Sequence, residues 1–121
     1  MNKKILTVDD SRTMRDMLKL ALSDAGYDVV QAEDGVDGLE TLDREGADVV
    51  ITDINMPRMD GFGFIEGVRA NPAYRGLPVL VLTTESSPEK KARAKEAGAT
   101  GWIVKPFDPV KLVDVVRRVS G

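Results

Sequence analysis

The chain has 121 residues, of which 42% are hydrophobic and 31% are charged, and its formal net charge is −3. These values are typical of one soluble globular domain, and 17 basic against 20 acidic residues do not indicate a nucleic-acid-binding surface. Because the sequence contains no Cys and no His, disulfides, Ser-His-Asp triads and zinc sites built on Cys or His are excluded. Any chemistry must use carboxylates, Lys, hydroxyl groups and a hard metal ion.

The apolar runs fall well short of the roughly 18 residues that a membrane-spanning helix needs. The amino terminus passes from Met-Asn-Lys-Lys directly into a strand pattern, without the features of a signal peptide. We therefore expect one domain over residues 1–121, in the cytoplasm and as a monomer, with no membrane segment and no attached output domain.

Short β-branched runs alternate along the chain with longer segments of helical period. The predicted strands are residues 5–8, 27–32, 49–52, 79–83 and 101–104. The first predicted helix follows the first strand, with Ser11 as its N-cap and Gly26 at its end. Its apolar residues at i, i+3 and i+4 spacing are Met14, Met17, Leu18, Ala21 and Ala25.

The remaining helices are marked by their boundary residues. Residues 36–44 and 62–70 read as the second and third helices. For the fourth, Ser-Ser-Pro-Glu at 86–89 places Ser before Pro88, a favoured residue at the first helical position, and Gly98 closes the helix. Asp108 and Pro109 open the fifth in the same way. Its apolar face consists of Leu112, Val113, Val116 and Val119.

Strict alternation of strand and helix predicts an α/β fold with a doubly wound, five-stranded parallel sheet and five helices covering its two faces. In such sheets the ligand site lies outside the carboxyl ends of the strands. The polar residues at or shortly after the carboxyl ends of the predicted strands are Asp9, Asp10, Asp53, Asn55, Thr83, Thr84, Glu85 and Lys105.

Three carboxylates at one sheet edge repel one another, so we expect a cation to bind among them. Mg²⁺ fits best, because it prefers carboxylate, carbonyl and water oxygens and shares its coordination sphere with phosphate. Lys105 adds a positive charge and Thr83 a hydroxyl donor for a phosphoryl oxygen. No P-loop occurs, and residues 61–67 lack the third Gly of a dinucleotide fingerprint, so a nucleotide cofactor is not expected.

A carboxylate that attacks phosphorus forms an aspartyl phosphate, which needs neither His nor Cys. Asp53 is the best candidate nucleophile because it follows the most apolar strand, which we expect to be central in the sheet, and Asp9 and Asp10 would then hold the metal. Taken singly, an Asp after a strand is more often a helix cap or turn residue; the joint placement at four of five strand ends favours a site. Asn55 stays ambiguous as a metal ligand, and Asp60 as a cap of the third helix.

Four segments carry a family resemblance: Val-Asp-Asp at 8–10, Asp-Ile-Asn-Met-Pro-Arg-Met-Asp-Gly at 53–61, Leu-Thr-Thr-Glu at 82–85 and Gly-Trp-Ile-Val-Lys-Pro-Phe at 101–107. In order and spacing they resemble the receiver domain of two-component response regulators, and among these the stand-alone chemotaxis regulators of the CheY type. The resemblance covers essentially the whole chain and implies a flavodoxin-like strand order of 2-1-3-4-5.

The same resemblance implies a role for each site residue. Asp53 would be the phosphoacceptor; its side chain, that of Asp10 and the Asn55 carbonyl would bind Mg²⁺, with Asp9 acting through water. Thr83 and Lys105 would contact the phosphoryl group. The resemblance further implies a cis bond between Lys105 and Pro106.

Two further positions concern the lifetime of the signal and its readout. Asn55 and Glu85 would tune self-dephosphorylation, and Trp102 would occupy the switch position together with Thr83. The sequence departs from the family pattern at Trp102, where Tyr or Phe is usual, and at Thr84, where Ala or Gly is usual. A Trp that is simply packed at a sheet edge is the alternative to a switch.

The resemblance implies a phosphohistidine donor on a CheA-like histidine kinase, and as output partner a flagellar motor switch protein or a phosphatase. We expect the protein to catalyse only its own phosphorylation and dephosphorylation, without turning over a separate substrate. A phosphate sink that drains a shared kinase is an alternative. A Mg²⁺-dependent phosphatase is less well supported, because Asn55 stands where such an enzyme has its acid/base Asp.

Overall fold

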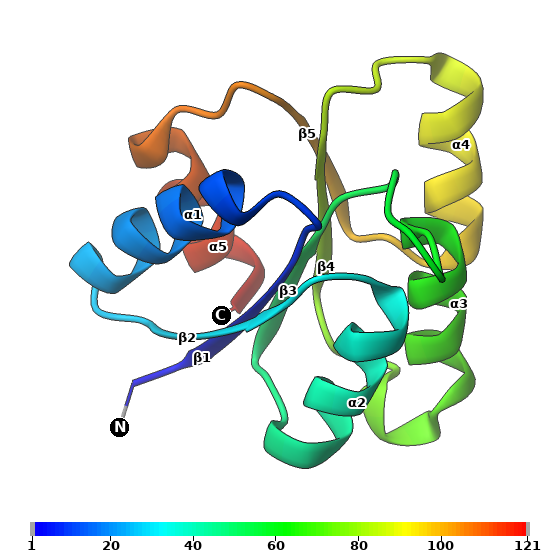
Figure 1. Ribbon diagram of the computed structural model, residues 1–121, viewed down its shortest axis with the longest axis horizontal. Coiled ribbons are helices and arrows are strands. Elements are labelled where there is room, and N and C mark those ends of the chain that lie inside the picture. Colours follow the sequence, from blue (N-terminus) through cyan, green and yellow to red (C-terminus); the bar gives the residue numbers. More distant parts are fainter. Residues whose placement is uncertain (1, 121) are drawn as a thin grey trace.

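The computed structural model describes residues 2–120. Across this range five strands form one parallel sheet in the order β2-β1-β3-β4-β5, as the family resemblance implies (Figure 1). The strands are β1 (Lys4–Val8), β2 (Asp28–Ala32), β3 (Val49–Thr52), β4 (Val79–Thr83) and β5 (Gly101–Val104). The α/β fold class predicted from the alternation of elements is confirmed.

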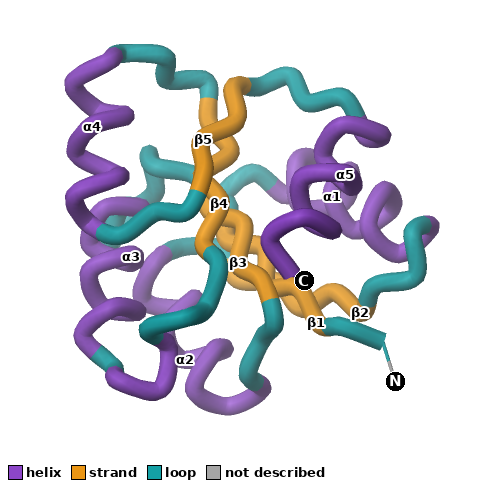
Figure 2. The backbone as a smooth tube through the Cα atoms, turned by 180° about the vertical axis from the view of Figure 1, so that it is seen from behind, coloured by secondary structure: helices purple, strands orange, loops and turns teal. Residues whose placement is uncertain are grey.

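The helices connect successive strands and cover both faces of the sheet. They are α1 (Arg12–Asp24), α2 (Gly35–Glu45), α3 (Gly61–Ala70), α4 (Pro88–Ala97) and α5 (Pro109–Ser120), with a short 3-10 helix at Pro72–Tyr74. Figures 1 and 2 show α1 and α5 on one face and α2, α3 and α4 on the other. Among the described residues, no helix has the length and apolar character that crossing a membrane requires.

Two apolar cores, one on each face, hold these layers together. Phe64, Ile65 and Val68 of α3 belong to the larger core, between the sheet and α2, α3 and α4. Leu18 and Leu22 of α1 belong to the second core, which α5 completes. Because β3 lies between β1 and β4 and is covered on both sides, all four of its residues are buried. The strand that ends at Asp53 is therefore central, as its apolar run predicted.

The caps that stop and start these helices agree closely with the sequence signals. Ser11, Asp60 and Ser87 each accept a backbone N–H of the first turn of their helix, and Gly98 closes α4 with a φ of 112°. The prediction was wrong for Met17, which is 50% exposed. Each residue turns an α-helix by about 100°. Met17 therefore lies to one side of the buried face of α1, which contains Leu18 and Leu22.

The strand register decides which polar residues meet. Val8 of β1 lies opposite Thr52 of β3, so Asp9 and Asp53 follow directly from paired residues. Thr83 of β4 lies opposite Val104 of β5, which brings Lys105 to the same edge. Since the strands are parallel, these residues all emerge at the carboxyl edge of the sheet.

Candidate functional site

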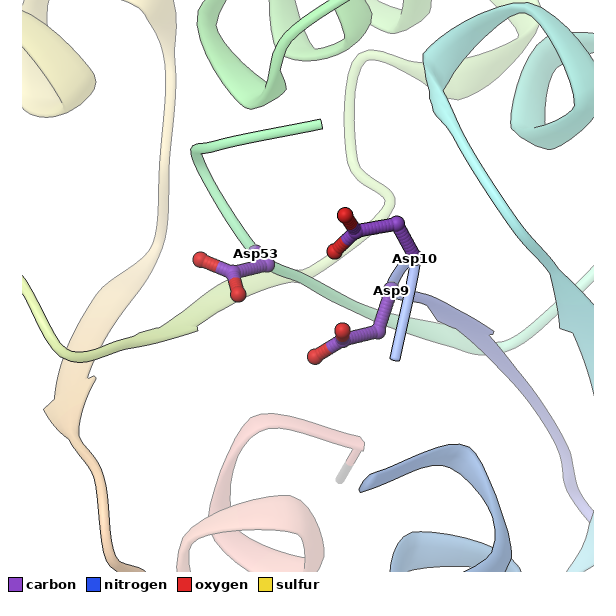
Figure 3. A group of neighbouring side chains, drawn as sticks. All are labelled: Asp9, Asp10 and Asp53. Carbon is purple, nitrogen blue, oxygen red and sulfur yellow. The ribbon is translucent and has the colours of Figure 1, made fainter. Parts of the chain in front are cut away.

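Three carboxylates meet at the carboxyl edge of the sheet. One oxygen from each of Asp9, Asp10 and Asp53 lies within 4.8 Å of the others. Figure 3 shows Asp9 and Asp10 leaving the end of one strand and Asp53 leaving its neighbour, with the carboxylates pointing to the same side. Asp9 and Asp53 are buried, whereas Asp10 is exposed. The acidic cluster expected from the strand ends is therefore present.

Lys105 lies against this cluster. Its Nζ donates to Asp53 Oδ2 at 2.7 Å and to Asp9 Oδ2 at 2.9 Å, and its side chain is only 10% exposed. Burial disfavours the ammonium form, but the hydrogen bonds to Asp53 and Asp9 outweigh it and raise the pKa of Lys105. The Lys105–Pro106 peptide bond is cis, as expected. A charged ammonium thus contacts two of the three carboxylates.

Both the carboxylate and the backbone carbonyl of Asp9 accept hydrogen bonds from α1 and the residue before it. The Ser11 backbone N–H donates to Asp9 Oδ1 at 2.9 Å, and Arg15 Nη1 donates to the Asp9 carbonyl at 2.6 Å. Burial raises the pKa of Asp9, although the Ser11 hydrogen bond and Lys105 act in the opposite direction. No signal in the sequence indicates this role of Arg15, because only the packing of α1 beside the end of β1 brings its guanidinium to this carbonyl.

The donor set fits a hard divalent cation. Three carboxylates face a single ammonium group, so negative charge is in excess in the cluster. All the candidate ligand atoms are oxygens, which Mg²⁺ prefers, and the exposed Asp10 leaves one side of the cluster open to solvent. The residues present therefore suit the metal expected from the sequence.

A second group of polar residues lies beside the cluster. Asn55 Nδ2 donates to Glu85 Oε1 at 3.2 Å, so the β3–α3 and β4–α4 loops touch at these two residues. Lys90 Nζ also contacts Glu85 Oε1, at 3.0 Å. The hydrogen bonds from Lys90 and then Asn55 lower the pKa of Glu85. Lys90 is on α4, and its pairing with Glu85 depends on how the loop before α4 folds, which the sequence does not indicate.

The two predicted switch residues both bond to the backbone of Glu85. The Glu85 N–H donates to Thr83 Oγ1 at 3.3 Å, and Trp102 Nε1 donates to the Glu85 carbonyl at 3.2 Å. Thr83 is buried and Trp102 is partly buried on the edge strand β5, while Thr84 is exposed. The indole also lines a surface hollow of about 500 Å³ between α4 and β5. Glu85 therefore connects Asn55, Thr83 and Trp102.

Comparison with known proteins gives a consistent result. The family model described as the response regulator receiver domain matches residues 5–117. The chain is 42% identical over 120 residues to the chemotaxis protein CheY1 of Helicobacter pylori, covering 98% of this chain and 97% of the relative. It is 40% identical over 119 residues to the chemotaxis protein CheY-3 of Vibrio cholerae, covering 98% and 92%.

A solved structure shows the same agreement in three dimensions. The high-resolution structure of the chemotaxis protein CheY4 of Vibrio cholerae, crystallised at low pH, is similar to this chain with a TM-score of 0.94. The two are 48% identical, and the match covers 98% of this chain and 99% of the other. Fold and sequence therefore agree.

Proposed function

Because the chain belongs to the response regulator receiver domain family and is of the CheY chemotaxis type, we propose that it is a single-domain regulator phosphorylated on Asp53 by a histidine kinase. Phosphorylation changes a binding surface on α4 and β5, and the output partner is a component of chemotaxis or of the flagellar motor. The protein catalyses its own phosphorylation and dephosphorylation and turns over no separate substrate.

The contact of Lys105 with Asp53 is the observation that supports this proposal most strongly. A buried ammonium 2.7 Å from Asp53 Oδ2 lies where negative charge develops when that carboxylate takes up a phosphoryl group. Fixed positive groups at such a position stabilise phosphoryl transfer because they need no reorganisation during the reaction. Asp9, 2.9 Å from the same Nζ, keeps the ammonium in place.

In the transfer step an oxygen of the Asp53 carboxylate attacks phosphorus and forms a new O–P bond. The bond from phosphorus to the donor breaks, and the leaving group keeps the electron pair. The leaving group is the imidazole nitrogen of a phosphohistidine, or an acetate oxygen when acetyl phosphate is the donor. Lys105 and the Thr83 hydroxyl stabilise the phosphoryl oxygens.

Asp10, Asp53 and the Asn55 carbonyl would hold Mg²⁺, with Asp9 acting through water. The ion, when bound, offsets the negative charge of the phosphoryl oxygens.

Dephosphorylation restores the starting carboxylate. Water attacks phosphorus, the bond to Asp53 breaks, and inorganic phosphate leaves. Asn55 and Glu85 hydrogen-bond to each other across the two loops beside Asp53, where they can tune the approach of this water. Asp53 thus alternates between a free carboxylate and an acyl phosphate. The rate of hydrolysis sets how long the phosphorylated, signalling form lasts.

Glu85 links the phosphorylation site to the proposed binding surface, because its carbonyl accepts the Trp102 indole N–H. A shift of Thr83 toward a phosphoryl group on Asp53 would displace the Glu85 backbone and with it Trp102. The hollow beside Trp102 is also lined by Lys91 and Lys95, which suits an acidic partner peptide.

Labelling with acetyl phosphate tests the phosphoacceptor. We expect wild-type protein to gain one phosphoryl group in the presence of Mg²⁺, measured by intact-mass spectrometry, and Asp53→Asn to gain none. Asp60→Asn is the matched control: Asp60 caps α3, which Asn also does well, so this variant should label normally. Stoichiometric label on Asp53→Asn would rule out the assignment.

Capture of a motor switch protein tests the output. Retention that increases when beryllofluoride is added as a phosphoryl mimic supports a motor regulator. Retention by neither form would instead indicate a phosphate sink for a shared kinase.

A further inference from the structure

The β3–α3 loop contains a backbone conformation that is unusual for its residue type. Among the described residues, Arg58 is the only one other than Gly with a positive φ, at 61°. The Met59 N–H donates to the Pro57 carbonyl at 2.6 Å, which closes a three-residue γ-turn around Arg58. A γ-turn with positive φ at its centre is rare and strained, and such strain persists only where neighbouring contacts hold it.

The contact that holds this turn is an ion pair with Asp34. Arg58 Nε donates to Asp34 Oδ2 at 2.8 Å and Nη2 to Asp34 Oδ1 at 3.1 Å, so the guanidinium binds both carboxylate oxygens. Asp34 is only 4% exposed at its side chain and caps α2 by accepting the Asp37 N–H. The turn is thus anchored to the rigid start of a helix.

A backbone contact reinforces the same junction. The Gly35 N–H donates to the Met59 carbonyl at 3.1 Å. A Cβ at Gly35 would lie 2.7 Å from that carbonyl oxygen, so the first residue of α2 approaches the loop more closely than other residue types permit. The ion pair and this hydrogen bond together fix the outer end of the loop on α2.

The inner end of the loop is part of the phosphorylation site. The Gly61 N–H donates to the Ile54 carbonyl at 2.8 Å, which closes the base of the loop directly after Asp53. Asn55 lies between this base and the Arg58 turn, and its side chain contacts Glu85. The position of Asn55 therefore depends on a short segment held at both ends.

We propose that Asp34 and Arg58 are a positioning pair for the phosphorylation site: by fixing the Arg58 turn on α2, they hold Asn55 where its carbonyl can bind the metal ion. The inference rests on the proposed function, because it assumes that the cluster of Asp9, Asp10 and Asp53 binds Mg²⁺. Neither residue of the pair touches the reacting atoms.

Two single variants isolate the ion pair. Asp34→Asn removes the charge but keeps an N-cap residue, and Arg58→Asn removes the guanidinium but keeps a residue that tolerates positive φ. The affinity for Mg²⁺ alone is measured by isothermal titration calorimetry on folded protein, well below each Tm.

A positioning role predicts that both variants raise the Kd for Mg²⁺ by about threefold or more, somewhat less than the roughly tenfold or greater loss that follows removal of a direct partner of a metal ligand. The double variant should lose no more than either single variant, because the two residues act as one unit. Arg44→Gln, at an exposed pair on α2 (Arg44 with Glu45), is the control and should bind as wild type.

The direction of the effects separates positioning from simple electrostatics. Removing a negative charge at Asp34 weakens binding of a cation in either case, but removing the positive charge of Arg58 should tighten it if only net charge matters. Tighter or unchanged Mg²⁺ binding by folded Arg58→Asn would overturn the proposal. If instead wild-type protein neither binds Mg²⁺ nor labels at Asp53, the proposed function itself fails.

Discussion

Two ion-paired regions at the carboxyl edge of the sheet differ in how their charges balance. In the Lys105 cluster, one ammonium pairs with Asp9 and Asp53 while Asp10 is a third carboxylate nearby, and the side chains of Lys105, Asp9 and Asp53 are 10%, 3% and 11% exposed. In the Asp34–Arg58 pair, one buried carboxylate faces one guanidinium that is 57% exposed. A balanced pair can serve as an anchor, whereas an excess of carboxylates leaves room for a bound cation.

Removing the single cation from the first region should give the largest effect. For Lys105→Met we expect phosphorylation by acetyl phosphate to fall at least about 100-fold, because the fixed positive charge near Asp53 is lost. Without metal, the free energy of unfolding should fall on the order of 3 kcal/mol, since two buried carboxylates lose their partner. Mg²⁺ should bind this variant more tightly than wild type, because one positive charge has left the site.

Labelling kinetics and urea unfolding with and without Mg²⁺ measure these effects. Lys111→Met, at an exposed lysine of α5, is the matched control and should leave both measurements unchanged. Equal stability of Lys105→Met and wild type in metal-free buffer would show that the cluster does not depend on its ammonium.

Binding of Mg²⁺ at the carboxylate cluster should have an intermediate effect on stability, one that the balanced Asp34–Arg58 pair does not share. Because the carboxylates come together only in the folded chain, Mg²⁺ at about 100 times its Kd should raise the free energy of unfolding by about 2.7 kcal/mol. Asp10→Asn should require more Mg²⁺ for the same gain while keeping nearly wild-type stability in metal-free buffer, since Asp10 is exposed.

Urea unfolding across a Mg²⁺ titration measures this shift. Asp16→Asn, at an exposed position of α1, should follow the wild-type titration. A coincident curve for Asp10→Asn would exclude that carboxylate from the metal site.

The smallest expected effect is the acid dependence of the Asp34–Arg58 pair. The hydrogen bond from Arg58 lowers the pKa of Asp34 below its ordinary value of 3.8. A carboxyl group whose pKa is lowered in the folded state adds stability that is complete above the ordinary value and lost as pH falls through the folded pKa. Asp34→Asn should therefore be less stable than wild type at neutral pH, and the difference should shrink below pH 3.8.

Urea midpoints of wild type and Asp34→Asn over this pH range provide the measurement. Asp43→Asn, at an exposed acid of α2, is the control at neutral pH and should keep the wild-type urea midpoint there. A stability difference that stays constant into acid would mean that the Asp34→Asn substitution disturbs the cap of α2 and that the ion pair adds no stability.

The elements were predictable wherever local rules govern them. Ser87 before Pro88 marked the start of α4, and the apolar run that ends at Thr52 marked the central strand, because capping and burial on both faces leave direct signals in the sequence. Met17 was misassigned because a run of apolar residues around a helix does not show which side meets the sheet.

The candidate site was predictable in its members but not in its contacts. Asp9, Asp10, Asp53 and Lys105 follow strand ends, and the parallel topology guarantees a common edge. The contacts of the Lys105 ammonium depend on the β4–β5 register and on the direction of the chain after β5. Arg58 and Asp34, 24 residues apart, showed no signal of pairing, since each has an ordinary local reading as a turn residue or a helix cap.

By itself, the sequence determined the fold class and the chemical inventory of this protein, because strand and helix periods and the absence of Cys and His are properties of the chain alone. Only the tertiary structure decided that two of the three clustered carboxylates share one ammonium, that Glu85 contacts both Asn55 and Trp102, and that Arg58 is tied to α2. The physical reason is that ion pairs and hydrogen bonds act over a few ångströms, and only folding brings distant residues that close.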